Sequence, residues 1–350
     1  MSSLRLLLLP LSCVYWLGVV LRNWFFDIGV FRVVRLEVPV VSVGNIAAGG
    51  TGKTPFVEFI VNKLKSMGHK PGIVSRGYGR DGTGYRLVSD GKSLSVNARQ
   101  GGDEPVLLAQ HLPGTPVAVG ANRVEASQRM LEECDADCIV MDDGFQHRAL
   151  HRDVDFVLLS ASDLFGRRWL LPAGNRRETL VSLRRADMAV ISKCRSDAEY
   201  REATQSLTGV ASTKISGFQY EPCSLCRMPS GAAIERPRGD TLRVVIAAGI
   251  GDFESFRAIV RQSGCQVLRE VEFRDHAWYS GLDLDALKDL VDREKAEYLV
   301  TTEKDIVRMQ TLGDAYAEFL REVPLAVLKL RLRMVAGEER VDELLERAFA

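Results

Sequence analysis

A glycine-rich segment at residues 44–55 carries the strongest chemical signal in the sequence. It reads Gly-Asn-Ile-Ala-Ala-Gly-Gly-Thr-Gly-Lys-Thr-Pro, between a β-branched run expected to be a buried strand and a helical apolar pattern that starts at Phe56. A strand, a glycine-rich turn and a helix form the context of a phosphate-binding P-loop. The loop amides and the helix N-terminus attract phosphate oxygens, and Lys53 can reach the β- and γ-phosphates. Because the Thr54 hydroxyl is placed to bind Mg²⁺, the segment predicts nucleotide binding.

The P-loop departs from two related motifs. A strict P-loop has glycine at the position of Ala47, and positioning ATPases of the deviant Walker type have lysine at the position of Ala48. The second difference disfavours a positioning ATPase, and a glycine-rich turn without a ligand is the other alternative. We expect ATP contacts from Ala47, Ala48, Gly49, Gly50, Thr51, Gly52, Lys53 and Thr54.

Two adjacent carboxylates follow a second apolar run. Residues 138–141 read Cys-Ile-Val-Met, and Asp142 and Asp143 come directly after them. A P-loop enzyme needs an acid at the end of a neighbouring strand to hold the water shell of its metal. We therefore expect both aspartates at the metal site, with a capped turn as the alternative interpretation. Gln146 and His147 continue the segment with hydrogen-bonding groups.

Other polar segments add candidate residues. A glycine-rich loop that follows a predicted strand holds Arg76, which suits an anion. A Gly-Asp-Glu-Pro motif places Asp103 and Glu104 before an expected helix, where a helix cap is the plainer interpretation. In the carboxyl half, a Phe-Arg-Asp-His segment ends at His276, and a Thr-Thr-Glu-Lys-Asp segment ends at Asp305.

The elements that position these groups begin with an uncharged N-terminal run. Residues 6–21 carry no charge, and aromatic residues follow at 24–26. A bilayer span needs about 20 apolar residues, so we expect a membrane helix that spans the bilayer or lies in its interface. A cleaved signal peptide and a buried core helix are the alternatives, but no small-x-small cleavage site follows the run. Arg22, Arg32 and Arg35 on its carboxyl side place the rest of the chain in the cytoplasm.

Composition bounds the class of protein. The chain has 350 residues, 46 Lys and Arg against 46 Asp and Glu, and 46% hydrophobic residues, which are ordinary values for a globular protein. Without a basic excess, a nucleic-acid partner is disfavoured. Seven scattered cysteines fit a reducing compartment better than a disulfide framework, and the pair Cys223 and Cys226 is weak support for zinc.

Strand and helix patterns alternate along the chain and predict an α/β fold with a largely parallel sheet. Since the alternation restarts near residue 242, we expect a P-loop NTPase-like domain followed by a smaller C-terminal α/β lobe. The active site would then lie in the cleft, where lobe closure could bring groups of the two lobes together. The expected parts are a membrane helix at 1–26, the P-loop domain at 27–221, a linker at 222–241 and the second lobe at 242–350.

Taken together, these motifs resemble the tetraacyldisaccharide 4'-kinase family of lipid A biosynthesis. They follow in order over nearly the whole chain, and the ordered set is specific. Two positions depart from the family pattern: Asn175-Arg176 stands where members tend to have proline and an apolar residue, and Ala277 stands where many have a second histidine. The resembling motifs lie at residues 38–45, 49–55, 75–79, 102–105, 142–147, 171–174, 248–251, 275–276 and 302–305.

The resemblance implies ATP-dependent phosphorylation of the 4'-hydroxyl of a tetraacylated glucosamine disaccharide 1-phosphate. ATP and Mg²⁺ are then the cofactors, and the partners are this lipid A precursor and the inner leaflet of the membrane. The protein would lie at the cytoplasmic face of the bacterial inner membrane. The sequence identifies no protein partner.

The resemblance also implies roles for individual residues. The family pattern points to Asp103 as the base and to His276 as its orienting partner, while Lys53 stabilises charge on the γ-phosphoryl group. The metal ligands would be Thr54, Asp142, Asp143 and Glu104. Weaker substrate or anion contacts would come from Arg76, Arg123, Gln146 and His147.

The main alternative is a membrane-associated P-loop ATPase that acts as a positioning or regulatory switch. Such a protein would hydrolyse ATP without an acceptor, and Asp103 and His276 would need no joint role. A GTPase is the third possibility. The nearest approach to a guanine-recognition motif has Glu303 where that motif needs asparagine.

Overall fold

The computed structural model describes residues 7–161, 164, 169–194, 196–209, 214–235 and 241–350. In that part of the chain one sheet has the strands β1 (Val40–Asn45), β2 (Pro71–Ser75), β3 (Arg86–Ser89), β4 (Val117–Val119), β5 (Cys138–Asp142), β6 (Val154–Ser160), β7 (Met188–Ser192), β8 (Lys214–Arg227), β9 (Leu242–Ala248), β10 (Cys265–Glu272), β11 (Tyr298–Thr301) and β12 (Leu325–Ala336). Their order across the sheet is β10-β9-β11-β12-β8-β7-β6-β1-β5-β2-β4-β3. Neighbours run parallel except the pairs β12–β8 and β3–β4. The predicted α/β fold with a largely parallel sheet is confirmed.

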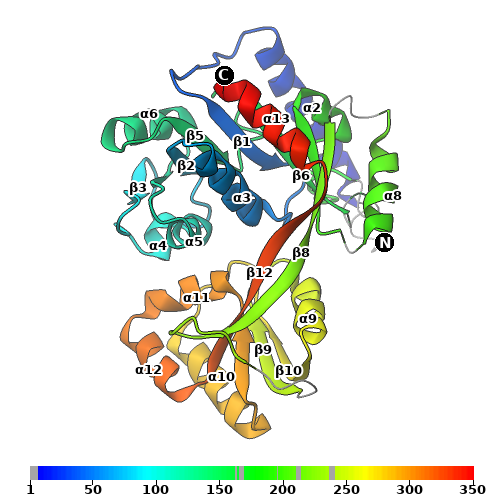
Figure 1. Ribbon diagram of the computed structural model, residues 1–350. Coiled ribbons are helices and arrows are strands. Elements are labelled where there is room, and N and C mark those ends of the chain that lie inside the picture. The colour runs from blue at the N-terminus through cyan, green and yellow to red at the C-terminus, as the bar shows by residue number, and fades with distance from the viewer. Residues whose placement is uncertain (1–6, 162–163, 165–168, 195, 210–213, 236–240) are drawn as a thin grey trace.

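Helices connect the strands and cover both faces of the sheet (Figure 1). They are α2 (Leu9–Asp27), α3 (Lys53–Ser66), α4 (Ala98–Gly101), α5 (Asp103–His111), α6 (Arg123–Glu133), α8 (Asp197–Leu207), α9 (Phe253–Gln262), α10 (Gly281–Glu294), α11 (Glu303–Met309), α12 (Asp314–Glu322) and α13 (Glu338–Phe349). Two short 3-10 helices lie at Leu180–Arg185 and Gln310–Leu312.

The first lobe consists of β1 to β7 with α3 to α6, α8 and α13. Its central strands are buried along their whole length, as expected of parallel strands with helices on both faces. The predicted helix after the P-loop is α3, and its apolar side packs into this core. The ring of Phe56 stacks on Phe218 of β8 at 5.7 Å between centroids. The P-loop helix is therefore fixed to the sheet immediately after the loop.

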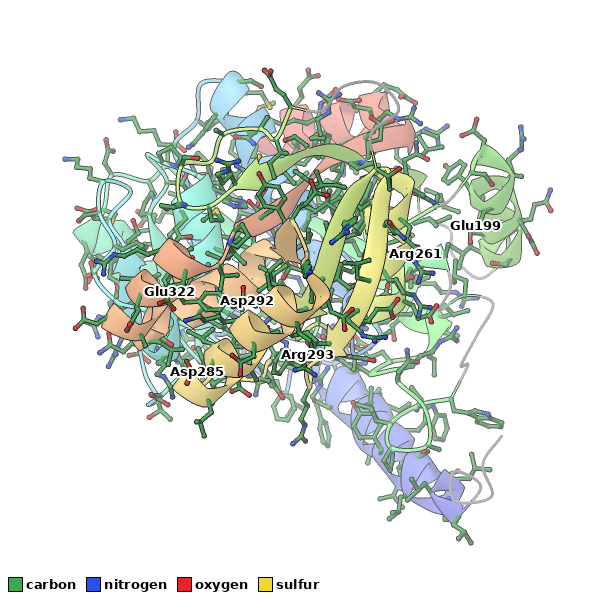
Figure 2. The ribbon with its side chains drawn as sticks, turned by 90° about the horizontal axis from the view of Figure 1, so that it is seen from below. Glu199, Arg261, Asp285, Asp292, Arg293 and Glu322 are labelled. Carbon is green, nitrogen blue, oxygen red and sulfur yellow. The ribbon has the colours of Figure 1, made fainter. Side chains whose placement is uncertain are left out.

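The second lobe consists of β9 to β11 with α9 to α12. A core cluster with Leu287, Leu299 and Phe319 holds α10 and α12 against the sheet. The alternation of strands and helices restarts with β9 at Leu242, at the position that the sequence predicts. The acidic and basic side chains of α10 and α12, such as Asp292, Arg293 and Glu322, lie on the outer surface (Figure 2).

The antiparallel pair β8 and β12 belongs to both lobes. It is paired from Gly217 and Ala336 in the first lobe to Arg227 and Ala326 in the second, and both strands cross the gap between the lobes (Figure 1). The segment 222–241, expected as a linker, therefore begins inside β8. A regular strand pair that bridges the lobes restricts their relative movement more than a flexible linker would.

The C-terminal helix α13 lies with the first lobe, although the expected division places residues 242–350 in the second. β12 carries the chain back to the first lobe, where Val341, Leu344 and Leu345 enter the core with Phe56. Lys63 of α3 also pairs with Asp342 at 2.6 Å. An amphipathic helix folds where its apolar side can be buried, and here that place is beside α3.

The N-terminal helix α2 contacts the first lobe through a polar side. The Ser12 hydroxyl donates to Leu170 O at 3.1 Å, and the Asn23 amide donates to Glu178 Oε2 at 3.0 Å. By length and composition α2 could cross a membrane, and in Figure 2 it projects from the body of the molecule. Its exposed apolar residues include Leu11, Val14, Trp16, Leu17, Val20, Leu21 and Trp24.

Candidate active site

The segment from Asn45 to Lys53 forms a tight turn between β1 and α3. Gly52 has a φ of 83° as the N-cap of α3, and a Cβ there would collide with the Tyr220 hydroxyl, so glycine is required. The Asn45 amide donates to Thr51 Oγ1 at 2.8 Å and holds the turn from the strand side. The loop therefore has the strand-turn-helix geometry that the sequence predicts for a phosphate site.

The structure places the predicted ATP contacts unequally. Ala47 is buried in an isolated bridge with Arg176 and does not line the cavity. Ala48 lines the cavity, but its backbone N–H donates to Asn175 O at 2.7 Å. Asn175 and Arg176, at a departure from the family pattern, thus support the back of the loop. The remaining predicted ATP contacts all line the cavity: Gly49, Gly50, Thr51, Gly52, Lys53 and Thr54.

Asp142 ends β5, next to the P-loop strand. Val43 of β1 pairs with it in parallel register, so the carboxylate emerges at the same sheet edge as the loop. The Ser75 hydroxyl donates to its Oδ2 at 2.8 Å, whereas Oδ1 is buried without a partner. Burial and the charge of Glu104 raise the pKa of Asp142 to about 6. A buried carboxylate oxygen without a partner is a position that a cation would stabilise.

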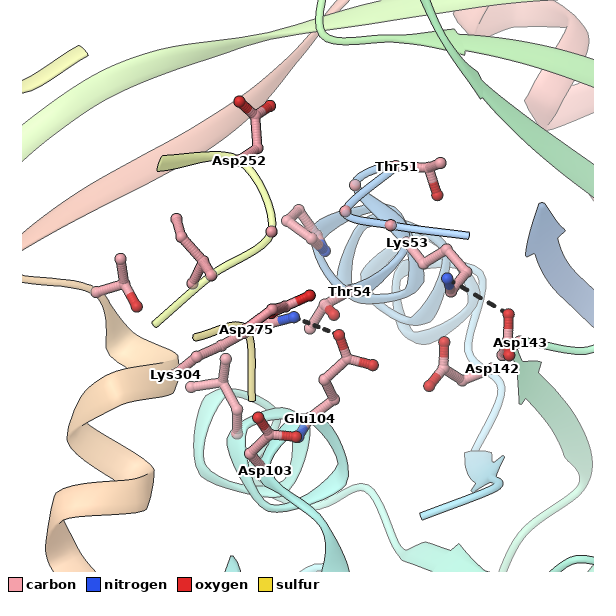
Figure 3. A pocket seen from close by; sticks show the side chains of 18 of the residues that line it. Thr51, Lys53, Thr54, Asp103, Glu104, Asp142, Asp143, Asp252, Asp275 and Lys304 are labelled. Carbon is pink, nitrogen blue, oxygen red and sulfur yellow. Dashed lines mark hydrogen bonds and ion pairs between the residues drawn. The ribbon is translucent and has the colours of Figure 1, made fainter. Parts of the chain in front are cut away.

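Asp143 has a different environment. Its φ of 53° turns the side chain toward the P-loop lysine, and Lys53 Nζ lies 3.3 Å from its Oδ1 (Figure 3). Arg177 Nη1 lies 3.0 Å from its Oδ2. Burial raises the pKa of Asp143, but the charges of Lys53 and Arg177 outweigh burial and lower the pKa to about 2. Asp143 therefore remains ionised and is paired with two cationic side chains, those of Lys53 and Arg177.

The donor set suits Mg²⁺ bound together with nucleotide phosphates. Thr54, Glu104 and Asp142 come from α3, α5 and β5, and their side chains converge on the same part of the cavity (Figure 3). Among the described residues no group of three or more His, Cys, Asp or Glu could hold a metal ion alone. Mg²⁺ commonly takes one or two carboxylates and completes its shell with phosphates and water, so the oxygen donors present fit this ion.

Asp103 and His276 meet across the two lobes. His276 Nδ1 lies 3.0 Å from Asp103 Oδ2, and the histidine backbone has a φ of 57°. Burial raises the pKa of Asp103, but the hydrogen bond from His276 and the charge of Lys304 lower it to about 2. The hydrogen bond to Asp103 in turn raises the pKa of His276. The two residues that the sequence separates by 173 positions therefore form a charged pair in this structure.

Two basic residues of α11 complete this contact, and neither was predicted as a site residue. Lys304 pairs with Glu104, and Arg308 Nε lies 3.4 Å from Asp103 Oδ2 (Figure 3 shows the former pair). Burial raises the pKa of Glu104, but the charges of Lys304 and Lys53 lower it. The Thr302–Asp305 motif was the signal for Lys304, but its target in the other lobe could not be inferred from the motif.

Another ion pair between the lobes lies over the P-loop. Lys193 follows β7 with a φ of 58°, and its Nζ lies 2.6 Å from Asp252 Oδ2 at the start of α9. A Cβ at Gly50 would lie 3.8 Å from the same Nζ. Neither Lys193 nor Asp252 was predicted as a site residue, because nothing local in the sequence marks either of them.

The four weaker candidates all line the cavity. Arg76 is exposed there, and Arg123 is buried, which lowers its pKa to about 10. Gln146 donates to Asn45 O at 2.8 Å and so supports the start of the P-loop. Burial and the charge of Arg123, with further arginines, lower the pKa of His147 to about 4. This part of the cavity is therefore strongly cationic and suits an anion. Both members of the cysteine pair at 223 and 226 are free.

A cavity of about 1930 Å³ lies between the lobes, and the site residues that line it include Ala48 to Thr54 of the P-loop, Asp103, Glu104, Asp142, Asp143, Lys193, Asp252, His276 and Lys304. A cavity for one drug-sized ligand is typically about 300–1,000 Å³, so this one has room for a nucleotide and a second, larger substrate. Residues from the P-loop, the Asp142 strand end and the second-lobe turn at Ile250 share its wall. The expected position of the site, in the cleft between the lobes, agrees with this geometry.

Comparison with known proteins identifies the family. A family model described as tetraacyldisaccharide-1-P 4'-kinase matches residues 4–350. A tetraacyldisaccharide 4'-kinase of Syntrophus aciditrophicus is 39% identical over 318 residues, 88% of this chain and 85% of that protein. One of Chlorobium phaeovibrioides is 37% identical over 348 residues, 97% of this chain and 96% of that protein. The "apo" form of LpxK from Aquifex aeolicus in complex with ATP superposes with a TM-score of 0.78 at 31% identity, over 99% of this chain and all of that one. This chain therefore belongs to the tetraacyldisaccharide-1-P 4'-kinase family.

Proposed function

We propose that the protein is an ATP-dependent kinase that phosphorylates the 4'-hydroxyl of a tetraacylated glucosamine disaccharide 1-phosphate in lipid A biosynthesis. Family membership supports the activity, and the similar structure in complex with ATP supports ATP as the phosphoryl donor. The observation that carries the proposal is geometric: the P-loop of the first lobe and the Asp103–His276 pair, which joins the two lobes, face one cavity.

The P-loop side binds and polarises ATP. The amides of Gly49 to Gly52 and the N-terminus of α3 hold the phosphates, and Lys53 exchanges its contact with Asp143 for the β- and γ-phosphates. Thr54, Glu104, Asp142 and Asp143 would hold Mg²⁺, directly or through water. Mg²⁺ held there would supply positive charge against the charge that develops on the transferred phosphoryl group.

Asp103 and His276 activate the hydroxyl of the acceptor. A sugar hydroxyl is a weak nucleophile, so its proton must leave as the new O–P bond forms. Asp103 accepts this proton, and His276 holds the carboxylate in place through the 3.0 Å hydrogen bond. In a loose phosphoryl-transfer transition state the proton moves late, so a carboxylate of low pKa is a suitable acceptor.

The cationic part of the cavity would bind the acceptor's own phosphate. Arg76, Arg123, Gln146 and His147 all line the cavity. Arg123 lies close enough to Arg76, Asp142 and Asp143 for their charges to shift its pKa, and the charges of Arg123 and Arg76 act on His147. Arginine suits phosphate because its planar fork donates two parallel hydrogen bonds. Two of the four side chains, Arg123 and Gln146, are already hydrogen-bonded to backbone carbonyls, which fixes their direction.

The membrane helix would lie in the interface of the inner membrane rather than across it. Contacts from Ser12, Tyr15 and Asn23 to the first lobe run along α2, and a helix across the bilayer could not make all three. The apolar side of α2 remains for the acyl layer. An acceptor with four acyl chains stays in that layer, so the cavity must open at the cytoplasmic face.

The test is transfer of labelled γ-phosphate from ATP in detergent micelles. We expect label on the tetraacyl disaccharide 1-phosphate and none on a matched lipid whose 4'-position lacks a hydroxyl. Release of labelled inorganic phosphate alone, at a rate indifferent to the lipid, would contradict the kinase and support a positioning ATPase.

A further inference from the structure

Arg308 is among the largest fully buried side chains of the protein. It is 1% exposed, lies in α11 of the second lobe and does not line the cavity. A guanidinium out of water is stable only where carboxylates or carbonyls satisfy it, because an unpaired buried charge is costly. The groups that surround Arg308 are therefore the parts of the structure that this buried charge holds in place.

Besides Lys304 O of its own helix, which accepts from Nε at 3.3 Å, four groups surround the guanidinium. Nη1 donates to Gly249 O at 2.9 Å and to Ala277 O at 3.2 Å. Nη2 lies 3.3 Å from Asp305 Oδ1, and Nε lies 3.4 Å from Asp103 Oδ2. Asp103 belongs to the first lobe and the other three groups belong to the second. Arg308 thus contacts the proposed base from the opposite lobe.

The two carbonyls come from the turns that carry and support His276. Ala277 follows this histidine directly, and the His276 backbone N–H donates to Gly249 O at 3.3 Å. A Cβ at Gly249 would lie 3.1 Å from the guanidinium, so this close approach favours glycine. The backbone on both sides of the histidine is therefore tied to one side chain.

Asp305 holds the same assembly from the other side. Its Oδ1 accepts hydrogen bonds from Gly249 N at 3.0 Å and from the Tyr279 hydroxyl at 2.8 Å. Asp305 is fully buried, and these two hydrogen bonds hold its carboxylate in one place. The Arg308–Asp305 pair thus joins α11 to the turn at Gly249 and to the segment that follows His276.

We propose that Arg308 is a positioning residue for phosphoryl transfer, which holds the Asp103 carboxylate and the His276 turn in register across the cleft. It touches neither ATP nor the acceptor and acts through Asp103 and His276. This inference rests on the proposed role of Asp103 as the base. Displacement of a reacting group by about 1 Å can cost about a hundredfold in rate, so the effect should fall on kcat.

The experiment compares Arg308→Lys and Arg308→Gln with Arg269→Lys, an exposed arginine of the second lobe paired with Glu294 at 2.9 Å. Lysine keeps the charge but cannot donate to both carbonyls and meet both carboxylates. For folded protein we expect kcat to fall at least about thirtyfold, with the KM for ATP changed less than about threefold. The Arg269 variant should match the wild type.

A double-mutant cycle separates positioning from general stability. In an Asp103→Asn background we expect Arg308→Lys to lower the remaining rate less than about threefold, because the group it positions is already gone. An equal loss in both backgrounds, or a kcat within threefold of wild type, would overturn the positioning role. Failure of both Arg308 variants to fold would also overturn the positioning role, because it would show that Arg308 stabilises the fold of the lobe. An undiminished rate in Asp103→Asn alone would instead refute the base, a distinguishable result.

Discussion

Three residues other than glycine with a positive φ line the cavity: Asp143, Lys193 and His276. Such a backbone conformation costs about 1–3 kcal/mol and persists only where the surroundings hold it. Each of the three is held by an ion pair, namely Asp143 with Lys53, Lys193 with Asp252 and His276 with Asp103. Two of these pairs cross between the lobes. The residues with a strained backbone are therefore the ones that form ion pairs within the site.

Asp142 should cost stability when Mg²⁺ and ATP are absent. Its folded pKa of about 6 lies above the ordinary value of 3.8, so the folded state loses stability as the pH rises through 6 and the carboxyl ionises. In metal-free protein, Asp142→Asn should raise the free energy of unfolding by about 2 kcal/mol above pH 6, and the gain should fade between pH 6 and 4. Urea unfolding at pH 4, 5, 7 and 8 measures this.

The same Asp142→Asn variant should transfer phosphate at least about a hundredfold more slowly, because it loses a carboxylate proposed to hold the Mg²⁺ that would neutralise transition-state charge. A variant that is both more stable and less active indicates a residue selected for function. A pH-independent stability difference, or an unchanged rate, would contradict this account of Asp142.

At the scale of elements, α5 and α11 are connected at three points between the lobes. The contacts are Asp103 with Arg308, Glu104 with Lys304, and His111 with Glu303 at 3.1 Å. His111 also lies 2.8 Å from Glu58 of α3. The helix that begins with the proposed base is therefore held at both of its ends by the second lobe.

The His111 contact predicts a pH-dependent stability. Burial lowers the pKa of His111, but hydrogen bonds to Glu303 and Glu58 outweigh it and raise the pKa to about 10 from 6.5. Its stabilisation is thus fully present below pH 6.5 and is lost as the pH rises through 10. His111→Gln should cost about 2 kcal/mol at pH 6 and little at pH 10, measured by urea unfolding. A cost that is equal at both pH values would exclude a charged His111.

Local elements could be predicted from the sequence, whereas their assembly could not. The P-loop, the strand ending at Asp142 and the strands β9 and β11 carry apolar runs with glycine or acid at their ends. These are local signals. The β8–β12 pair depends on strand pairing between residues about a hundred positions apart. The amphipathic pattern of α13 predicts a helix, but it does not indicate which element the helix packs against.

The same distinction applies to the site. Asp142 and the P-loop could be placed together, since parallel neighbouring strands end at one sheet edge. The resemblance to a family paired Asp103 with His276, but no spacing could. The roles of Arg308 and Lys193 depend on contacts between lobes, and a single arginine or lysine in a helix or loop gives no signal of such a contact. Ala47 was grouped with the ATP contacts by position in the motif, yet it is buried away from the cavity.

At the scale of the whole molecule, the last helix stabilises the first lobe. Leu344 of α13 is 3% exposed and lies in the core with α3, whereas Leu287 of α10 lies in the core of the second lobe. Either leucine changed to alanine should cost about 2–5 kcal/mol. Hydrogen exchange should increase first in α3 for Leu344→Ala and first in α10 for Leu287→Ala. Exchange that increases only in the second lobe for Leu344→Ala would contradict the observed packing.

The exposed side of α2 should decide membrane attachment. Leu17 and Trp24 are 51% and 52% exposed on this helix, and Leu282 is 80% exposed on the second lobe. An aspartate in the apolar layer costs about 2.5–3.5 kcal/mol, so Leu17→Asp with Trp24→Asp should weaken binding to anionic vesicles at least about tenfold. Leu282→Asp is the control and should bind as the wild type does. Equal vesicle binding by all three proteins would contradict a membrane role for α2.

The most direct test of the account is the rate of a single turnover in the Asp103→Asn variant. The amide keeps the size of the side chain and removes its capacity to accept a proton, while the P-loop is unchanged. With labelled ATP and the tetraacyl disaccharide 1-phosphate, we predict a rate at least about a hundredfold below wild type at saturating ATP. The exposed Asp90→Asn should behave as wild type. Transfer by Asp103→Asn within tenfold of the wild-type rate would contradict the assignment of Asp103 as the base.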